Sequence, residues 1–138
     1  MTWIVNPNFG FVSLVAHRDL PGQLLVRGRE WAHLEELRKR HLDLLREVVI
    51  ESTPTADYSC RFTASATVMA EVLRREVEAI TYDNVKSAPA QRWGYGSAFV
   101  NALHACWSVL RRWQLRLQRP ALSPTPAGGN AVDGEVRP

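Results

Sequence analysis

Two pairs of short β-prone segments, each followed by a segment with helical periodicity, most constrain how this chain can fold. Residues 10–17 (GFVSLVAH) and 22–28 (GQLLVRG) flank the turn-forming run RDLPG and predict a β-hairpin. A second strand pair is expected at about 47–52 and 57–63, because Pro54 between them excludes a continuous helix and favours a turn. This order predicts an antiparallel sheet.

The segments that follow the strand pairs have apolar residues three or four positions apart, as amphipathic helices do. The first helix is expected over about 29–42, with Trp31, Leu34 and Leu37 on one side. Ser65 can cap the second helix, because a serine hydroxyl accepts a hydrogen bond from a free N–H of the first turn. The apolar positions of the second helix are Val68, Val72, Leu73, Val77 and Ile80.

The longest periodic segment covers residues 97–118 and predicts a third amphipathic helix. At about 100° per residue, its apolar residues gather on one face. These residues are Phe99, Leu103, Cys106, Trp107, Leu110, Trp113 and Leu117. We expect this face to pack in the core and to close the sheet, with Trp107 and Leu110 as core residues.

Together these elements predict one α+β domain over residues 1–119. Its expected architecture is a ββαββα-like antiparallel sheet with helices on one face, followed by a C-terminal amphipathic helix. A chain of 138 residues can bury such a core without metal ions or disulfides. Residues 120–138 have Pro or Gly at seven of nineteen positions and no periodicity, so we expect a disordered tail.

The formal net charge of +3 is distributed unevenly along the chain. Residues 1–83 hold ten Lys or Arg and twelve Asp or Glu, whereas residues 84–132 hold six basic residues and no acidic one. Four of these six form a basic ridge on the polar side of the third helix: Arg111, Arg112, Arg116 and Arg119. A surface of one sign attracts nucleic acid, an anionic membrane or an acidic protein surface.

A polar run follows the second helix, YDNVK at residues 82–86, and it has two interpretations. As a connector, it would use Asp83 or Asn84 to cap the next helical turn. As a binding surface, it would offer a tyrosine ring and a lysine amine beside a nearby arginine. The candidate binding residues are then Tyr82, Lys86 and Arg92. The sequence leaves both interpretations open.

No catalytic residue set, metal site or cofactor is expected. Cys60 and Cys106 lack the short paired spacing of zinc ligands, and both are expected to be buried thiols. His33 and His41 are about 12 Å apart along the first helix, too far to share a metal ion, and are expected at the surface. His104 is expected to be solvated. The HRD triplet that begins at His17 has none of the other protein-kinase motifs around it.

Several short motifs also give the chain a resemblance to a known family. The segments GFVSLVAHRD, LLVRGR, DYSCR and ITYDNVKS resemble the ordered motifs of a widespread family of small uncharacterised bacterial and bacteriophage proteins. In that family a Tyr-x-Asn-Phe-Lys segment follows the second helix; Val85 stands here where phenylalanine is usual, and Cys60 where tyrosine is common. The resemblance spans roughly residues 3–107. It implies a phage or prophage accessory protein, a class that often binds and blocks a host component.

These observations predict a small non-enzymatic binding protein, a host-takeover or counter-defence factor that covers the surface of a host protein. The first alternative is a nucleic-acid-binding protein that uses the basic ridge of the third helix. The second alternative is a protein that lays this helix on an anionic membrane surface. No apolar run reaches the roughly 18 residues that span a bilayer, and the N-terminal region lacks the basic segment of a signal peptide, so a cytoplasmic location is expected.

Overall fold

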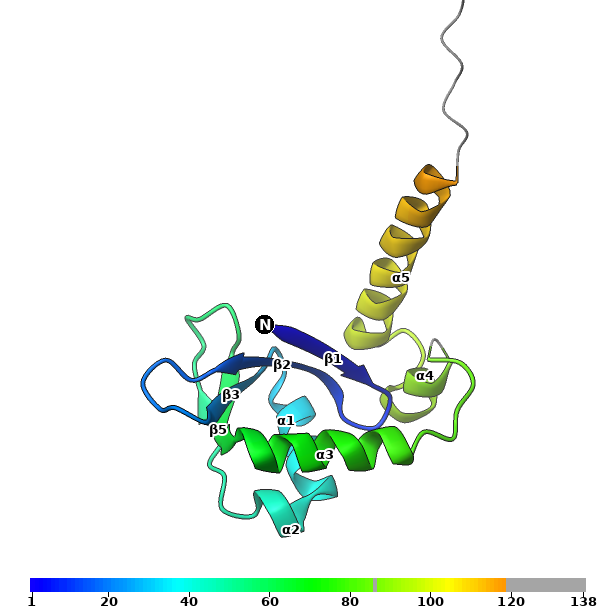
Figure 1. The fold of residues 1–138 in the computed structure, drawn as a ribbon. Helices are drawn as coiled ribbons and strands as arrows, with labels where there is room; N and C mark the ends of the chain where they lie inside the picture. Colours follow the sequence, from blue (N-terminus) through cyan, green and yellow to red (C-terminus); the bar gives the residue numbers. More distant parts are fainter. Residues whose placement is uncertain (86, 119–138) are drawn as a thin grey trace, which may run out of the picture.

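The computed structural model describes residues 1–85 and 87–118. Lys86, Arg119 and the tail predicted over residues 120–138 lie outside the described residues. Within the described ranges, the chain forms one five-stranded antiparallel sheet and five helices, which confirms the predicted α+β class (Figure 1).

The strands are arranged in the order β1-β2-β3-β5-β4, and every neighbouring pair is antiparallel. Their bounds are Thr2–Asn6 (β1), Gly10–Ala16 (β2), Gln23–Gly28 (β3), Glu51–Ser52 (β4) and Cys60–Ser65 (β5). The hairpin predicted from RDLPG is confirmed as β2–β3. The second predicted pair is present but shorter on its first strand, and β5 pairs with β3 along its whole length as well as with β4.

Strand β1 is absent from the sequence-based expectation. The β-prone run before Asn6 is short because Pro7 follows at once, and a run of this length does not predict a strand by itself. It becomes a strand because β2 pairs with it from Thr2 opposite Leu14 to Asn6 opposite Gly10.

The helices are Trp31–Arg40 (α1), Leu42–Leu45 (α2), Ala66–Glu78 (α3), Ala88–Trp93 (α4) and Ala98–Leu117 (α5). Figure 1 shows α1, α2 and α3 on one side of the sheet, and we call the sheet with these three helices the body. Helix α5 leaves the body near the end of β1 and extends away from these helices. The expectation that the last helix closes the sheet is therefore wrong.

The core lies between one face of the sheet and helices α1 to α3. Alternate residues of the central strands, such as Val12, Val26 and Phe62, point into it and are almost completely buried. Leu34 and Met69 meet them from the helices. Ser65 caps α3 as predicted, because its Oγ accepts a hydrogen bond of 3.1 Å from the Val68 N–H.

Several residues predicted to be buried are exposed. Trp107 and Leu110 are 46% and 61% exposed, and Cys106 is also exposed, although Cys60 is buried as predicted. These corrections have one cause, since α5 contributes buried residues only from its first turn. On α3, Val77 is exposed because Glu76 occupies the inward side of the last turn, and Ile80 lies beyond the helix end at Glu78.

The expectation that His33 and His41 are surface residues is also wrong, since both are buried. Each ring is buried against a specific partner. His41 Nε2 lies 2.7 Å from Glu76 Oε1, and His33 Nδ1 accepts a hydrogen bond of 3.4 Å from the Phe11 N–H. A polar residue can be buried when such a partner replaces water, and periodicity does not show where that partner is.

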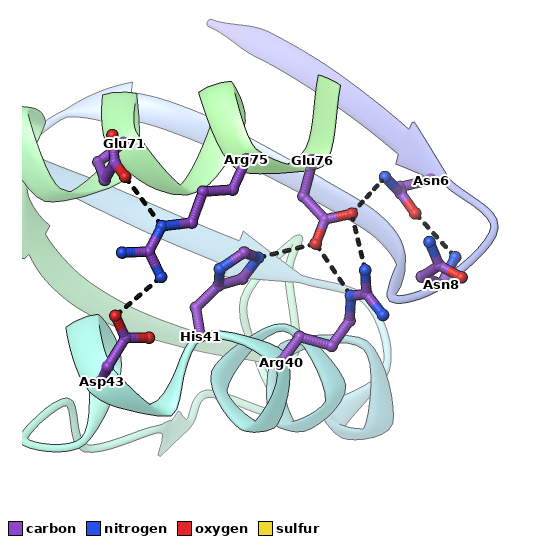
Figure 2. Close-up of polar contacts among 8 residues, drawn as sticks. All are labelled: Asn6, Asn8, Arg40, His41, Asp43, Glu71, Arg75 and Glu76. Atoms are coloured by element: carbon purple, nitrogen blue, oxygen red, sulfur yellow. Dashed lines mark hydrogen bonds and ion pairs between the residues drawn. The ribbon is translucent and has the colours of Figure 1, made fainter. Parts of the chain in front are cut away.

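Glu76 connects three parts of the fold, as Figure 2 shows. Asn6 Nδ2 at the end of β1 donates to Glu76 Oε2 at 3.0 Å, and Arg40 Nε at the end of α1 donates to Glu76 Oε1 at 2.9 Å. Although burial opposes the charge, the bonds from Arg40 and His41 dominate and lower the pKa of Glu76. The carboxylate is therefore held ionised in the folded state.

Replacing Glu76 with Ala is expected to lower the free energy of unfolding by about 3 kcal/mol, because the buried partners of the carboxylate lose it. Because the native pKa of Glu76 is depressed, its contribution is present above its ordinary pKa and is lost as the pH falls through the native value. Urea unfolding at several pH values measures both effects. The control is Glu78→Ala, an exposed pair with Arg74, with an expected change within about 0.5 kcal/mol. Equal losses in the two variants would contradict this role for Glu76.

Candidate functional site

Helix α5 is attached to the body through its first turn. Ser97 caps the helix, since its Oγ accepts a hydrogen bond of 3.3 Å from the Val100 N–H. Phe99 and Val100 are 8% and 2% exposed. The preceding helix α4 is held by Trp93, whose Nε1 donates to the carbonyl oxygen of Pro7 at 2.9 Å. The start of α5 is therefore fixed relative to the β1–β2 turn.

A cluster of three rings joins α1, α4 and α5. The ring of His33 lies edge-on to Trp93 and to Phe99, at centroid distances of 4.9 and 4.6 Å, and Trp93 lies 5.8 Å from Phe99. Gly10 makes room for this cluster, because a Cβ at that position would lie 2.2 Å from His33 Cδ2. Burial lowers the pKa of His33 and outweighs the attraction of the Glu30 carboxylate for a protonated ring. The neutral form of His33 is therefore favoured.

Beyond the first turn, the same apolar face of α5 continues along the exposed part of the helix. We define the outer stripe of α5 as Cys106, Leu110, Trp113 and Leu117. Leu110 and Trp113 are each 61% exposed, and Leu117 is more exposed still. Trp107 lies beside them and is half exposed. Exposed apolar surface of this extent is unusual on a soluble monomer.

The basic residues of α5 lie along the flank and back of this stripe. Arg111, Arg112 and Arg116 are exposed, and no carboxylate of the described residues forms an ion pair with any of them. Helix α5 contains no acidic residue. The helix therefore presents an apolar face bordered by positive charge.

The remaining candidate binding residues from the sequence lie apart from the outer stripe or outside the described residues. Tyr82 is half-buried in the segment after α3, and Arg92 on α4 forms an ion pair with Glu36 of α1. Lys86 and Arg119 lie outside the described residues, so the candidate set is described only in part.

The loop that follows α3 faces α5 across a shallow hollow. The residues that line it are Asn84, Ser87, Tyr95, His104, Trp107 and Ser108. The backbone carbonyl of Asn84 accepts hydrogen bonds from the Ala88 N–H at 3.3 Å and from Ser87 Oγ at 3.4 Å. The N-cap of α4 is Ser87, so the expectation that Asp83 or Asn84 caps this helix is wrong, and Asn84 rather than Tyr82 borders the hollow.

Two contacts near the exposed surfaces are also absent from the sequence-based expectation. One is the contact of His33 with the start of α5, for which the sequence offers no signal beyond a histidine on a helix. The other is a ring cluster around Tyr58 on the sheet face opposite the helices. The sequence points to this cluster only through the alternation of side chains along β2, which places Phe11 and Ser13 on the face opposite the core residue Val12.

Residues 1–85 and 87–118 contain no group of three or more His, Cys, Asp or Glu side chains placed to hold a metal ion. In the same ranges, no helix is long and apolar enough to cross a membrane.

No protein-family model, no curated protein and no solved structure matches this chain.

A pair of alanine substitutions tests where α5 stops being part of the core. Phe99→Ala is expected to lower the free energy of unfolding by about 3–5 kcal/mol, because it leaves a cavity beside His33 and Trp93. Leu110→Ala is expected to change it by no more than about 0.5 kcal/mol, because the side chain is already exposed. Chemical denaturation measures both. A loss of several kcal/mol in Leu110→Ala would show that the outer stripe is packed.

Proposed function

We propose that this chain is a cytoplasmic, non-enzymatic binding protein that inserts helix α5 into an apolar groove of a partner protein. The observation that carries the proposal is the exposure of Leu110, Trp113 and Leu117 on a helix that extends from the body. In this mode of recognition, an amphipathic helix lays its apolar face into a groove, with anchors about three or four residues apart. The outer stripe has this spacing.

The side chains of the outer stripe suit a tight interface. Trp113 offers a large ring at a low cost in conformational entropy, and tryptophan is enriched among residues that dominate binding energy. Complete burial of a leucine such as Leu110 contributes roughly 1.5–3 kcal/mol. Because the first turn already holds α5 in place, less conformational freedom is lost when the partner binds.

The charges of α5 narrow the chemistry of the partner. Arg111, Arg112 and Arg116 border or oppose the stripe, and the helix has no acidic residue to offset them. A groove with acidic residues at its rim would complement this pattern and accelerate association. We propose a host protein as this partner. Binding would then act by covering a surface that the host protein uses.

A second candidate function is adsorption of α5 to an anionic membrane surface. Trp113 and Leu117 lie on one side of the helix and Arg111 and Arg112 on the other, as in helices that lie in the membrane interface. A stripe that closed the sheet would be unavailable to a membrane. The stripe of α5 is available, because the buried residues of this helix lie only in its first turn.

A matched pair of substitutions tests the proposed function. Leu110→Asp places a charge in the outer stripe, whereas Leu115→Asp places the same charge on another side of the same helix, where the leucine is also exposed. We expect a host protein to be retained by the unmodified chain and by Leu115→Asp, and to be lost with Leu110→Asp. Affinity capture from nuclease-treated bacterial lysate, followed by titration of the identified protein, measures this difference.

Three outcomes would count against a protein groove. Equal retention by both variants would show that the stripe is not the contact. Loss of the captured protein after nuclease treatment would point to nucleic acid instead. Binding of the purified chain to vesicles with anionic lipids, abolished by Leu110→Asp and not by Leu115→Asp, would favour the membrane function.

A further inference from the structure

No helix covers the face of the sheet opposite α1 to α3 in the described part of the chain (Figure 1), and we call it the open face, although Ser13 and Tyr58 on it are themselves buried. The strand register places one row of side chains across it, because Trp3 pairs with Ser13, Ser13 with Arg27, and Arg27 with Arg61. Their neighbours along the strands, such as Val12 and Val26, point into the core. Side chains alternate between faces along a strand, so this row lies on the open face.

Tyr58 is the centre of a cluster of rings and guanidinium groups on this face. Its ring is nearly parallel to that of Phe11, with a centroid distance of 6.5 Å. The Cζ atoms of Arg27 and Arg29 lie 4.3 and 4.8 Å from the centroid of the Tyr58 ring. Trp3 Nε1 donates a hydrogen bond of 3.1 Å to the Tyr58 hydroxyl. The cluster is therefore organised before any ligand arrives.

The two arginines of the cluster keep their positive charge available. Arg27 Nη2 donates to Ser13 Oγ at 2.9 Å and to Met1 Sδ at 3.1 Å, and Arg29 Nη1 donates to the carbonyl oxygen of Asp57 at 3.0 Å. These acceptors are neutral, and no carboxylate among the described residues forms an ion pair with either arginine. Arg27 Nε is buried, but a guanidinium group has five N–H donors, so Arg27 Nη1 and the remaining donors of Arg29 are left for an anion.

Trp3 supplies an exposed aromatic surface beside these charges. It lies on the edge strand β1, is 60% exposed, and meets Phe11 edge-on at 5.7 Å. Two strand spacings separate Trp3 from Arg27, a distance of about 10 Å. An exposed ring with a cation at this distance, and a second cation beside the first, match a ligand in which flat aromatic groups alternate with anionic ones.

We propose that the open face of the sheet binds single-stranded nucleic acid, with a base stacked on Trp3 and backbone phosphates bound by Arg27 and Arg29. A single strand offers the free base faces that stacking requires, and a duplex does not. Stacking of this kind tolerates any base, so binding with little sequence preference is expected. The proposal concerns a different surface from helix α5 and does not rest on the function proposed for that helix.

The probe is a fluorescein-labelled oligothymidylate, titrated with the full chain at several salt concentrations and followed by fluorescence anisotropy. Trp3→Ala is expected to weaken binding roughly 5- to 150-fold, which corresponds to the loss of one stacked base. Trp3→Phe should restore part of the loss, because phenylalanine also stacks. Thermal melting of each variant shows whether it is folded.

The charge contribution is tested with a matched pair of arginine substitutions. Arg29→Gln is expected to weaken binding and to reduce the slope of log affinity against log salt by about 0.7, the value for one phosphate contact on a single strand. Arg18→Gln removes the same charge from the exposed β2–β3 turn and should have a much smaller effect on affinity. A chain in which Arg111, Arg112 and Arg116 are all replaced by Gln reports on helix α5.

Each of three results would overturn the proposal. The first is no binding by the unmodified chain at low salt. The second is binding that survives Trp3→Ala and Arg29→Gln and is lost when the three α5 arginines are replaced, which would assign it to the helix. The third is equal affinity for duplex and single-stranded probes, which would exclude stacking as the basis of recognition.

Discussion

The contact between His33 and the start of α5 determines what the rest of the molecule presents. The ring of His33 fits over Gly10 and packs against Trp93 and Phe99, so the last two helices are joined to α1 and to the β1–β2 turn. The contact ends after one turn of α5. The helix is therefore held in place at its beginning and largely exposed along the remainder of its length, an arrangement that suits a surface used for binding.

The pattern of ion pairs explains why positive charge is left over in two places. Carboxylates of the body pair with basic residues of the body, as Glu76 does with Arg40 and Glu71 with Arg75. In the described part of the chain, the arginines without such a carboxylate include those of α5 and the pair over Tyr58. Both groups lie beside exposed tryptophan, so charge and aromatic surface coincide at two separate sites.

Much of the fold could be predicted from sequence because it depends on local patterns. Turn residues located the β2–β3 hairpin, and Ser65 with the spacing after it located α3. The candidate site was harder to predict. Periodicity showed that Leu110 and Trp113 share a face of α5, but not whether another element covers that face. The partners of buried polar groups are also distant in sequence: Asn6 and Glu76 are 70 residues apart, so no local pattern could reveal that pair.

The central claim is that the apolar face of α5 is exposed beyond its first turn, and the two cysteines test it directly. Cys106 lies on the outer stripe and is exposed, whereas Cys60 is buried in the core, where burial raises the pKa of its thiol. The measurement is the rate of thiol modification by a chromogenic disulfide reagent in the native, dilute protein. The account predicts that Cys106 reacts rapidly and that Cys60 reacts only on unfolding. Protection of Cys106 to the same degree as Cys60 would contradict it.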